Sequence, residues 1–199
     1  MSIRGTKSDV TFLLILLAVS LGFNVYLARR AFRSPEPSRQ AAAAVRQPPA
    51  PPQLAVGTAL PPLEVKDLTG ETRTIDWAAA EPTVLYFFSP QCSWCAKNLD
   101  NVRRLEAELR GRYRFLGVSV VRADLDAYLE SNPLDFPIYS EPTPEGLAEY
   151  GLAGVPWTIV VSAEGNLLQS WSGAYADQLR PAVEGFFDVE LPGLIEDST

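Results

Sequence analysis

One pair of cysteines, Cys92 and Cys95, constrains this chain more than any other feature. The chain has no other cysteine, and the pair follows a short apolar run at residues 84–88. After it, apolar side chains recur every three or four positions, which predicts an amphipathic helix over 92–110 that ends at Gly111. At a helix start, unpaired amide groups and the helix dipole favour a thiolate. The sequence therefore predicts a dithiol redox site, with Cys92 as the nucleophile and Cys95 as the resolving cysteine that releases the product.

Three other interpretations of the pair remain open. A purely structural disulfide would close a very short loop, which restrains little chain entropy. A zinc site needs about four ligands, and the chain has no histidine and no third cysteine. The two cysteines could also be ordinary core residues. The position of the pair between a strand and a helix favours the redox site, so we expect no metal and no cofactor beyond the redox-active disulfide of Cys92 and Cys95.

The chain changes character near residue 53. Residues 10–28 are free of charge, and this run is long enough for a helix that crosses the hydrocarbon core of a membrane. It follows a short tip at 1–9 and ends in a basic stretch, which suits a membrane boundary better than a cleavage site. Residues 29–53 are rich in proline and alanine and predict a linker, and residues 54–199 have the composition of one folded domain. We therefore expect a membrane anchor, a spacer and a tethered domain.

Charge is divided in the same way. Residues 1–53 hold seven Lys and Arg against two Asp and Glu, whereas residues 54–199 hold ten against twenty-two. Phosphate groups would repel such an acidic domain, so we expect no nucleic-acid partner. The basic residues on the two sides of the anchor are nearly balanced and do not fix its orientation. Since the chain has no spare thiol to cross-link, it suits an oxidising compartment, and we expect the domain on the extracytoplasmic (periplasmic) side.

Hydrophobic periodicity predicts an α/β domain. A hairpin is expected around a turn at 67–70, and strands at 84–88 and 115–121 flank the helix at 92–110, so these two strands should be parallel. The other expected elements are a helix at 124–131, a strand at 136–139, a helix at 143–150, a hairpin of strands at 158–161 and 167–171, and a helix at 176–187. Together they predict a mixed central sheet flanked by helices.

With Gly154-Val155-Pro156 placed before the last hairpin, this order of elements resembles the thioredoxin-like fold. The chain is similar to the membrane-anchored TlpA/ResA group of thiol-disulfide oxidoreductases, within the redoxin superfamily. The similarity lies in its N-terminal hairpin extension, its central αβ insert at about 122–139 and its apolar N-terminal run. The resemblance covers residues 54–188. It implies a cis bond between Val155 and Pro156, with the backbone of Val155 pairing with a substrate strand.

Three further residues join the predicted site. Ser93 and Trp94 lie between the cysteines and are expected to tune the redox potential, with Trp94 also facing the substrate. Trp157 is expected to shape the same groove. The carboxylates usual in the resembled families are absent, because Tyr86 and Asn98 stand at their positions. The chain also lacks the histidine that stabilises the thiolate in strongly oxidising relatives, which favours a reductant.

We therefore expect a membrane-tethered enzyme that exchanges, and mainly reduces, disulfides of protein partners, with apocytochrome c in cytochrome c maturation as one candidate substrate. Three other functions remain open. A peroxiredoxin-like thiol peroxidase fits Ser89-Pro-Gln-Cys92, although Leu85 stands where its proline is expected. The absence of histidine argues against a Sco-type copper chaperone. A non-catalytic binding module would use the acidic surface and the groove at Pro156.

Overall fold

The computed structural model describes residues 7–33 and 54–195, which belong to two compact units. Residues 1–6 of the predicted tip and 34–53 of the predicted linker lie outside the described residues. Helix α1 spans Lys7–Arg33 and is longer than the run predicted at 10–28. Within the described residues, no helix combines the length and the apolar character needed to cross a membrane. The membrane anchor at 10–28 stays a prediction.

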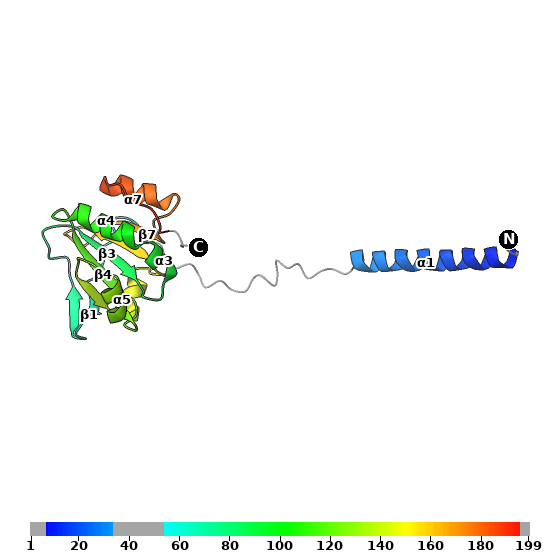
Figure 1. Ribbon diagram of the computed structural model, residues 1–199, viewed down its shortest axis with the longest axis horizontal. Coiled ribbons are helices and arrows are strands. Elements are labelled where there is room, and N and C mark those ends of the chain that lie inside the picture. Colours follow the sequence, from blue (N-terminus) through cyan, green and yellow to red (C-terminus); the bar gives the residue numbers. More distant parts are fainter. Residues whose placement is uncertain (1–6, 34–53, 196–199) are drawn as a thin grey trace. The chain divides into compact units, whose positions relative to one another are not determined.

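The domain is built on one seven-stranded mixed sheet, in the order β2-β1-β5-β4-β3-β6-β7 (Figure 1). In chain order its strands are β1 (Leu63–Lys66), β2 (Thr72–Ile75), β3 (Thr83–Phe88), β4 (Arg114–Ser119), β5 (Ile138–Ser140), β6 (Trp157–Val161) and β7 (Leu167–Ser172). β3, β4 and β5 run parallel to one another, whereas the hairpins β1–β2 and β6–β7 are antiparallel. The predicted mixed sheet, N-terminal hairpin and αβ insert are confirmed.

The central strand β3 is buried on both faces because its sequence is apolar at nearly every position. Tyr86 and Phe88 point into a core that also holds Cys95, which we call the cysteine-side core. Leu85 and Phe87 point into a second core on the other face of the sheet, the opposite core. β3 pairs along its whole length with β4, and it pairs antiparallel with β6. This rigid strand ends a few residues before the cysteine pair and anchors the loop that carries it.

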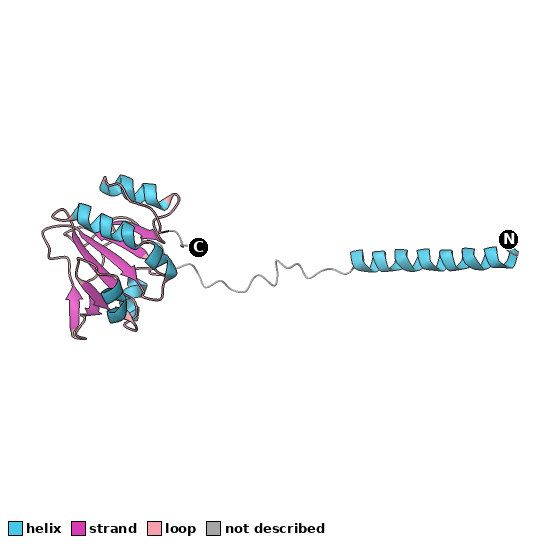
Figure 2. Ribbon diagram, viewed as in Figure 1, coloured by secondary structure: helices cyan, strands magenta, loops and turns pink. Residues whose placement is uncertain are grey.

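The helices of the domain are α3 (Ser93–Lys97), α4 (Leu99–Leu109), α5 (Leu125–Ser131), α6 (Pro144–Glu149) and α7 (Leu179–Phe187). Val102 of α4 and Val183 of α7 lie in the cysteine-side core, so these two helices cover the same face of the sheet (Figure 2). Leu147 of α6 packs against the opposite core. The domain therefore has three layers, with the sheet in the middle.

Two helices differ from the sequence prediction. The helix expected over 92–110 is divided at Asn98, whose side chain turns inward and accepts a hydrogen bond from the backbone N–H of Tyr175 at 2.9 Å. Asparagine side chains compete with the helix backbone for hydrogen bonds, which makes such a break favourable. The helix expected from residue 176 begins only at Leu179, because Asp177 adopts a left-handed conformation with φ 44°.

Candidate active site

Cys92 and Cys95 form a disulfide at the start of α3. Their Cα atoms are 5.2 Å apart, within the range that a disulfide requires. Cys92 is the N-cap of the helix: its backbone is extended, and its Sγ accepts a hydrogen bond from the backbone N–H of Cys95 at 3.1 Å. The carbonyl of Ser89, just after β3, accepts a hydrogen bond from the N–H of Cys92 at 3.1 Å. The cap favours a thiolate on Cys92 once the disulfide is reduced.

The two sulfurs differ in their access to solvent. Cys92 is half-buried, whereas Cys95 is 1% exposed and belongs to the cysteine-side core. A protein disulfide that approaches from solvent can therefore reach Cys92 but not Cys95. This asymmetry is what the predicted roles of nucleophile and resolving cysteine require.

The loop that precedes β6 lies against the disulfide. The peptide bond between Val155 and Pro156 is cis, as the family resemblance implies. The carbonyl oxygen of Val155 is 3.6 Å from the Sγ of Cys92. Pro156 is buried, and its carbonyl accepts a hydrogen bond from the N–H of Gly173 at 2.8 Å. The half-buried Val155 and the sulfur of Cys92 thus share one surface, where an extended peptide can pair with the backbone while its disulfide meets Cys92.

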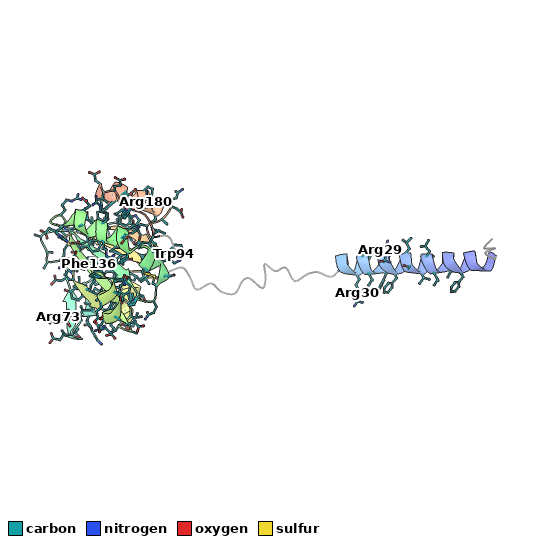
Figure 3. All side chains as sticks on the ribbon, in the orientation of Figure 1. Arg29, Arg30, Arg73, Trp94, Phe136 and Arg180 are labelled. Atoms are coloured by element: carbon teal, nitrogen blue, oxygen red, sulfur yellow. A yellow bond between two sulfur atoms is a disulfide. The ribbon has the colours of Figure 1, made fainter. Side chains whose placement is uncertain are left out.

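Ser93 and Trp94 are both exposed on the first turn of α3. The indole of Trp94 is 55% exposed and lies at the surface of the domain (Figure 3). The Nζ of Lys97 lies 5.4 Å from the centre of its ring, a cation–π distance. The structure therefore places the predicted substrate-facing tryptophan at the solvent-exposed surface of the helix that begins after Cys92.

Trp157 lies on the other face of the sheet from Cys95. Its indole N–H donates to the Oγ of Ser170 at 2.7 Å, and its ring packs against the opposite core. It lines a cavity of about 240 Å³ together with Tyr150 and residues of β7, and neither cysteine is part of that lining. Because side chains alternate along a strand, the residue that begins β6 at this register faces away from Cys95.

Gln91 is a site residue that the sequence did not reveal. Its carboxamide nitrogen donates to a carboxylate oxygen of Asp124 at 2.9 Å and to the carbonyl of Ala123 at 3.2 Å. Its carboxamide oxygen accepts from the hydroxyl of Ser89 at 2.9 Å. Asp124 itself adopts a left-handed conformation with φ 62° at the start of α5. Gln91 therefore ties the loop before Cys92 to the αβ insert.

The chemistry of the site rests on its two sulfurs. Within residues 7–33 and 54–195, no group of three or more His, Cys, Asp or Glu side chains is arranged to hold a metal ion. The site combines a reachable sulfur at a helix start, a buried sulfur one turn away, and a backbone carbonyl beside them. This arrangement can carry out thiol–disulfide exchange through a mixed disulfide.

Comparison with known proteins agrees with this chemistry. A model of the AhpC/TSA family matches residues 56–170. The thiol-disulfide oxidoreductase ResA of Halalkalibacterium halodurans is 22% identical over 135 residues, which cover 64% of this chain and 73% of that protein. Among solved structures, the thioredoxin domain of a thiol-disulfide oxidoreductase from Bacteroides vulgatus aligns with a TM-score of 0.57 at 23% identity, covering 67% of this chain and 99% of that one. A thiol:disulfide interchange protein from Bacteroides sp. aligns with a TM-score of 0.56 at 22% identity, covering 69% and 93%.

Proposed function

Because the chain belongs to the AhpC/TSA family and is a thiol-disulfide oxidoreductase of thioredoxin-like fold, we propose that it reduces disulfides of protein partners outside the cytoplasm, tethered to a membrane by residues 10–28. One observation supports the choice of a protein substrate above all: the half-buried Sγ of Cys92 lies 3.6 Å from the carbonyl of Val155. The reactive sulfur thus stands next to backbone that can pair with an extended peptide.

The reaction proceeds in two exchanges. The thiolate of Cys92 attacks one sulfur of the partner's disulfide, which forms a mixed disulfide and releases the other sulfur as a thiolate that takes a proton. Cys95 then loses its proton and attacks the Sγ of Cys92, which releases the second partner thiol and closes the disulfide found in the structure. Two electrons pass from the enzyme to the partner, and a separate reductant must reopen the disulfide.

The reducing direction and the location rest on the sequence. With no histidine in the chain, no imidazolium can stabilise the thiolate of Cys92 as it does in strong oxidants. The charge-free run at 10–28 and the absence of any spare cysteine support a tethered domain in an oxidising compartment. Exported thiol proteins, apocytochrome c among them, are the class of partner that suits such a location.

Insulin reduction tests the proposal. We expect the wild-type protein, supplied with dithiothreitol, to accelerate the precipitation of insulin chains, and Cys92→Ser to abolish the acceleration because the attacking sulfur is gone. Cys95→Ser is the matched control, because it keeps Cys92 and removes only the release step. When this variant is reduced, freed of dithiothreitol and then mixed with insulin, it should accumulate a mixed disulfide with its partner, visible on a non-reducing gel. Full insulin reduction by folded Cys92→Ser would refute the proposal.

A thiol peroxidase is the second candidate, because the matching family model covers Ser89 and Cys92 at the spacing of a peroxidatic site. The structure argues against it at one point. The hydroxyl of Ser89 donates to Gln91 and also accepts from the backbone N–H of Gln91 at 3.3 Å, so it is engaged away from the sulfur. We expect hydrogen peroxide to be consumed no faster by the wild type than by Cys92→Ser, with a thiol donor present.

A further inference from the structure

Buried polar side chains lie behind the disulfide, in the face of the sheet that α3 and α4 cover. Tyr86 and Thr158 are direct partners on β3 and β6, so their side chains point to the same face. Tyr86 is 3% exposed, and Asn98, Thr158 and Tyr175 are fully buried. Tyr86 and Tyr175 share the cysteine-side core with Cys95. A polar cluster is therefore built into the apolar core beneath the resolving cysteine.

Part of this cluster is hydrogen-bonded. The hydroxyls of Thr158 and Tyr175 are 2.6 Å apart. The backbone N–H of Tyr175 donates to the Oδ1 of Asn98 at 2.9 Å, and the carboxamide of Asn101 donates to the same oxygen at 3.0 Å. These bonds fix the orientation of the Asn98 carboxamide, with its oxygen engaged and its nitrogen left to face Tyr86.

Two atoms of the cluster lack a partner among the described residues: the Oη of Tyr86 and the Nδ2 of Asn98. The two face each other, and Asn98 partly opposes the rise that burial causes in the pKa of Tyr86, but they are outside hydrogen-bond geometry. Both carry hydrogens to donate, and burying them unpaired is costly. These two groups can therefore donate hydrogen bonds to an acceptor that is present only in another state of the protein.

Reduction of the disulfide creates such an acceptor. Cys95 precedes Asn98 by three residues, and the N–H of Asn98 still donates to the carbonyl of Trp94 at 3.1 Å, so the two side chains lie on the same face of consecutive helical turns. While the disulfide is closed, the Sγ of Cys95 is bonded to Cys92 and is a poor acceptor. When it opens, the buried sulfur must carry a negative charge before it can attack.

We propose that the hydroxyl of Tyr86, oriented by Asn98, donates a hydrogen bond to the Cys95 thiolate and so speeds the resolving step. The proposal rests on the proposed dithiol exchange and assigns it one more residue. In that step the Cys95 thiol gives its proton to solvent, its sulfur bonds to the Sγ of Cys92, and the partner's sulfur leaves and takes up a proton. Tyr86 keeps its own proton throughout, because burial raises its pKa far above the usual value.

The titratable groups that shift the pKa of Tyr86 are other tyrosines, so its hydroxyl stays neutral and can act as a hydrogen-bond donor. The titratable side chains that act on it are Tyr175, from the segment before α7, and Tyr128 of α5. Cys92 packs against the same core from the start of α3. Among the described residues, no carboxylate contributes to the shift in the pKa of Tyr86.

The decisive variant is Tyr86→Phe, which removes the hydroxyl and keeps the ring. Tyr128→Phe is the matched control, since both rings pack against Phe88, at 5.9 and 5.8 Å between centroids. Each is combined with Cys92→Ser, so that Cys95 is the single thiol, and its ionisation is followed by thiolate absorbance as the pH is raised. We expect Tyr86→Phe to raise the pKa of Cys95, and Tyr128→Phe to leave it at the wild-type value.

In the presence of Cys92, the release of a preformed mixed disulfide should be about tenfold slower in Tyr86→Phe at neutral pH, with the deficit shrinking as the pH rises. Equal pKa values and release rates in wild type and Tyr86→Phe, or equal changes in both phenylalanine variants, would overturn the proposal. If Tyr86→Phe does not fold, a ring-fluorinated tyrosine at position 86 replaces it in the test. Its hydroxyl is a stronger hydrogen-bond donor, so it must lower the pKa of Cys95. The ionisation of Cys95 is measured without a partner, so failure here is distinct from a failure of insulin reduction.

Discussion

At the scale of single residues, Trp94 is the large exposed apolar side chain of α3, the helix that begins after Cys92. Its side chain is 55% exposed, so we expect Trp94 to contribute to the binding of protein substrates. Exposed aromatic side chains contribute strongly to protein–protein contacts. Trp94→Ala should therefore raise the KM for insulin about fivefold and leave the reduction of a small aromatic disulfide unchanged.

The control for this prediction is Leu68→Ala, which removes another exposed apolar side chain, 42% exposed, from the turn of the β1–β2 hairpin. That variant should match the wild type on both substrates. An equal loss of activity on insulin and on the small disulfide would show that Trp94 tunes the sulfurs instead. Steady-state kinetics with the two substrates separate these outcomes.

At the scale of elements, the carboxylate of Asp67 accepts the side-chain hydrogen bonds that organise the turn of the β1–β2 hairpin. Asp67 accepts hydrogen bonds from the hydroxyl of Thr69 at 2.6 Å and from its N–H at 3.0 Å, and from Arg73 at 2.8 Å (Figure 3 labels Arg73). These bonds, the Thr69 hydroxyl first, lower the pKa of Asp67 from 3.8 to about 2. Because the pKa is lowered by folding, the ionised carboxylate stabilises the hairpin fully above the unfolded value, and this contribution is lost as the pH falls from about 4 to about 2.

Asp67→Asn removes this pH-dependent contribution. The difference in Tm between the wild type and Asp67→Asn should be largest near neutral pH and should shrink as the pH falls from about 4 to about 2. Thr69→Val, which removes the strongest donor, is expected to reproduce part of the change. Thermal melts at matched ionic strength provide the measurement. A Tm difference that stays constant down to the lowest pH would show that the turn does not depend on the ionised carboxylate.

Elements with a clear hydrophobic period were predictable from the sequence. β3 could be placed because an uninterrupted apolar run fits a strand buried on both faces, and the parallel pairing with β4 follows from the helices between them. The break at Asn98 was not predictable, because it depends on the N–H of Tyr175, which is distant in the sequence. The late start of α7 depends on the backbone conformation of Asp177, which no pattern of apolar residues encodes.

The same limit applies to the site. The cysteine pair and the cis bond at Pro156 were predictable, the first from local spacing and the second from a family resemblance. The bond between Gln91 and Asp124 joins two loops that are far apart in the sequence, and no local pattern announces it. The register of β6 turns the ring of Trp157 to the opposite core, a placement that the sequence pattern did not predict. Local patterns locate reactive residues, whereas tertiary packing decides which side chains surround them.

At the scale of the whole molecule, the described domain contains every group that the proposed chemistry uses. The chain divides into two compact units, and the cysteines, Val155 and the buried polar cluster all belong to the second. Activity should therefore depend on residues 54–199 alone, and residues 1–53 should determine only where the enzyme works. The full-length chain and a fragment that begins at residue 54 allow these two properties to be measured separately.

We expect the fragment to have the same Tm and the same rate of insulin reduction as the full-length chain in detergent, because the apolar cores and the site lie within it. On fractionation of expressing cells, the full-length chain should sediment with membranes and resist extraction by high salt, whereas the fragment should stay in the supernatant. A full-length chain that leaves the membrane pellet in high salt would exclude an anchor at 10–28. A fragment that folds but does not reduce insulin would show that the N-terminal residues contribute to the reaction itself.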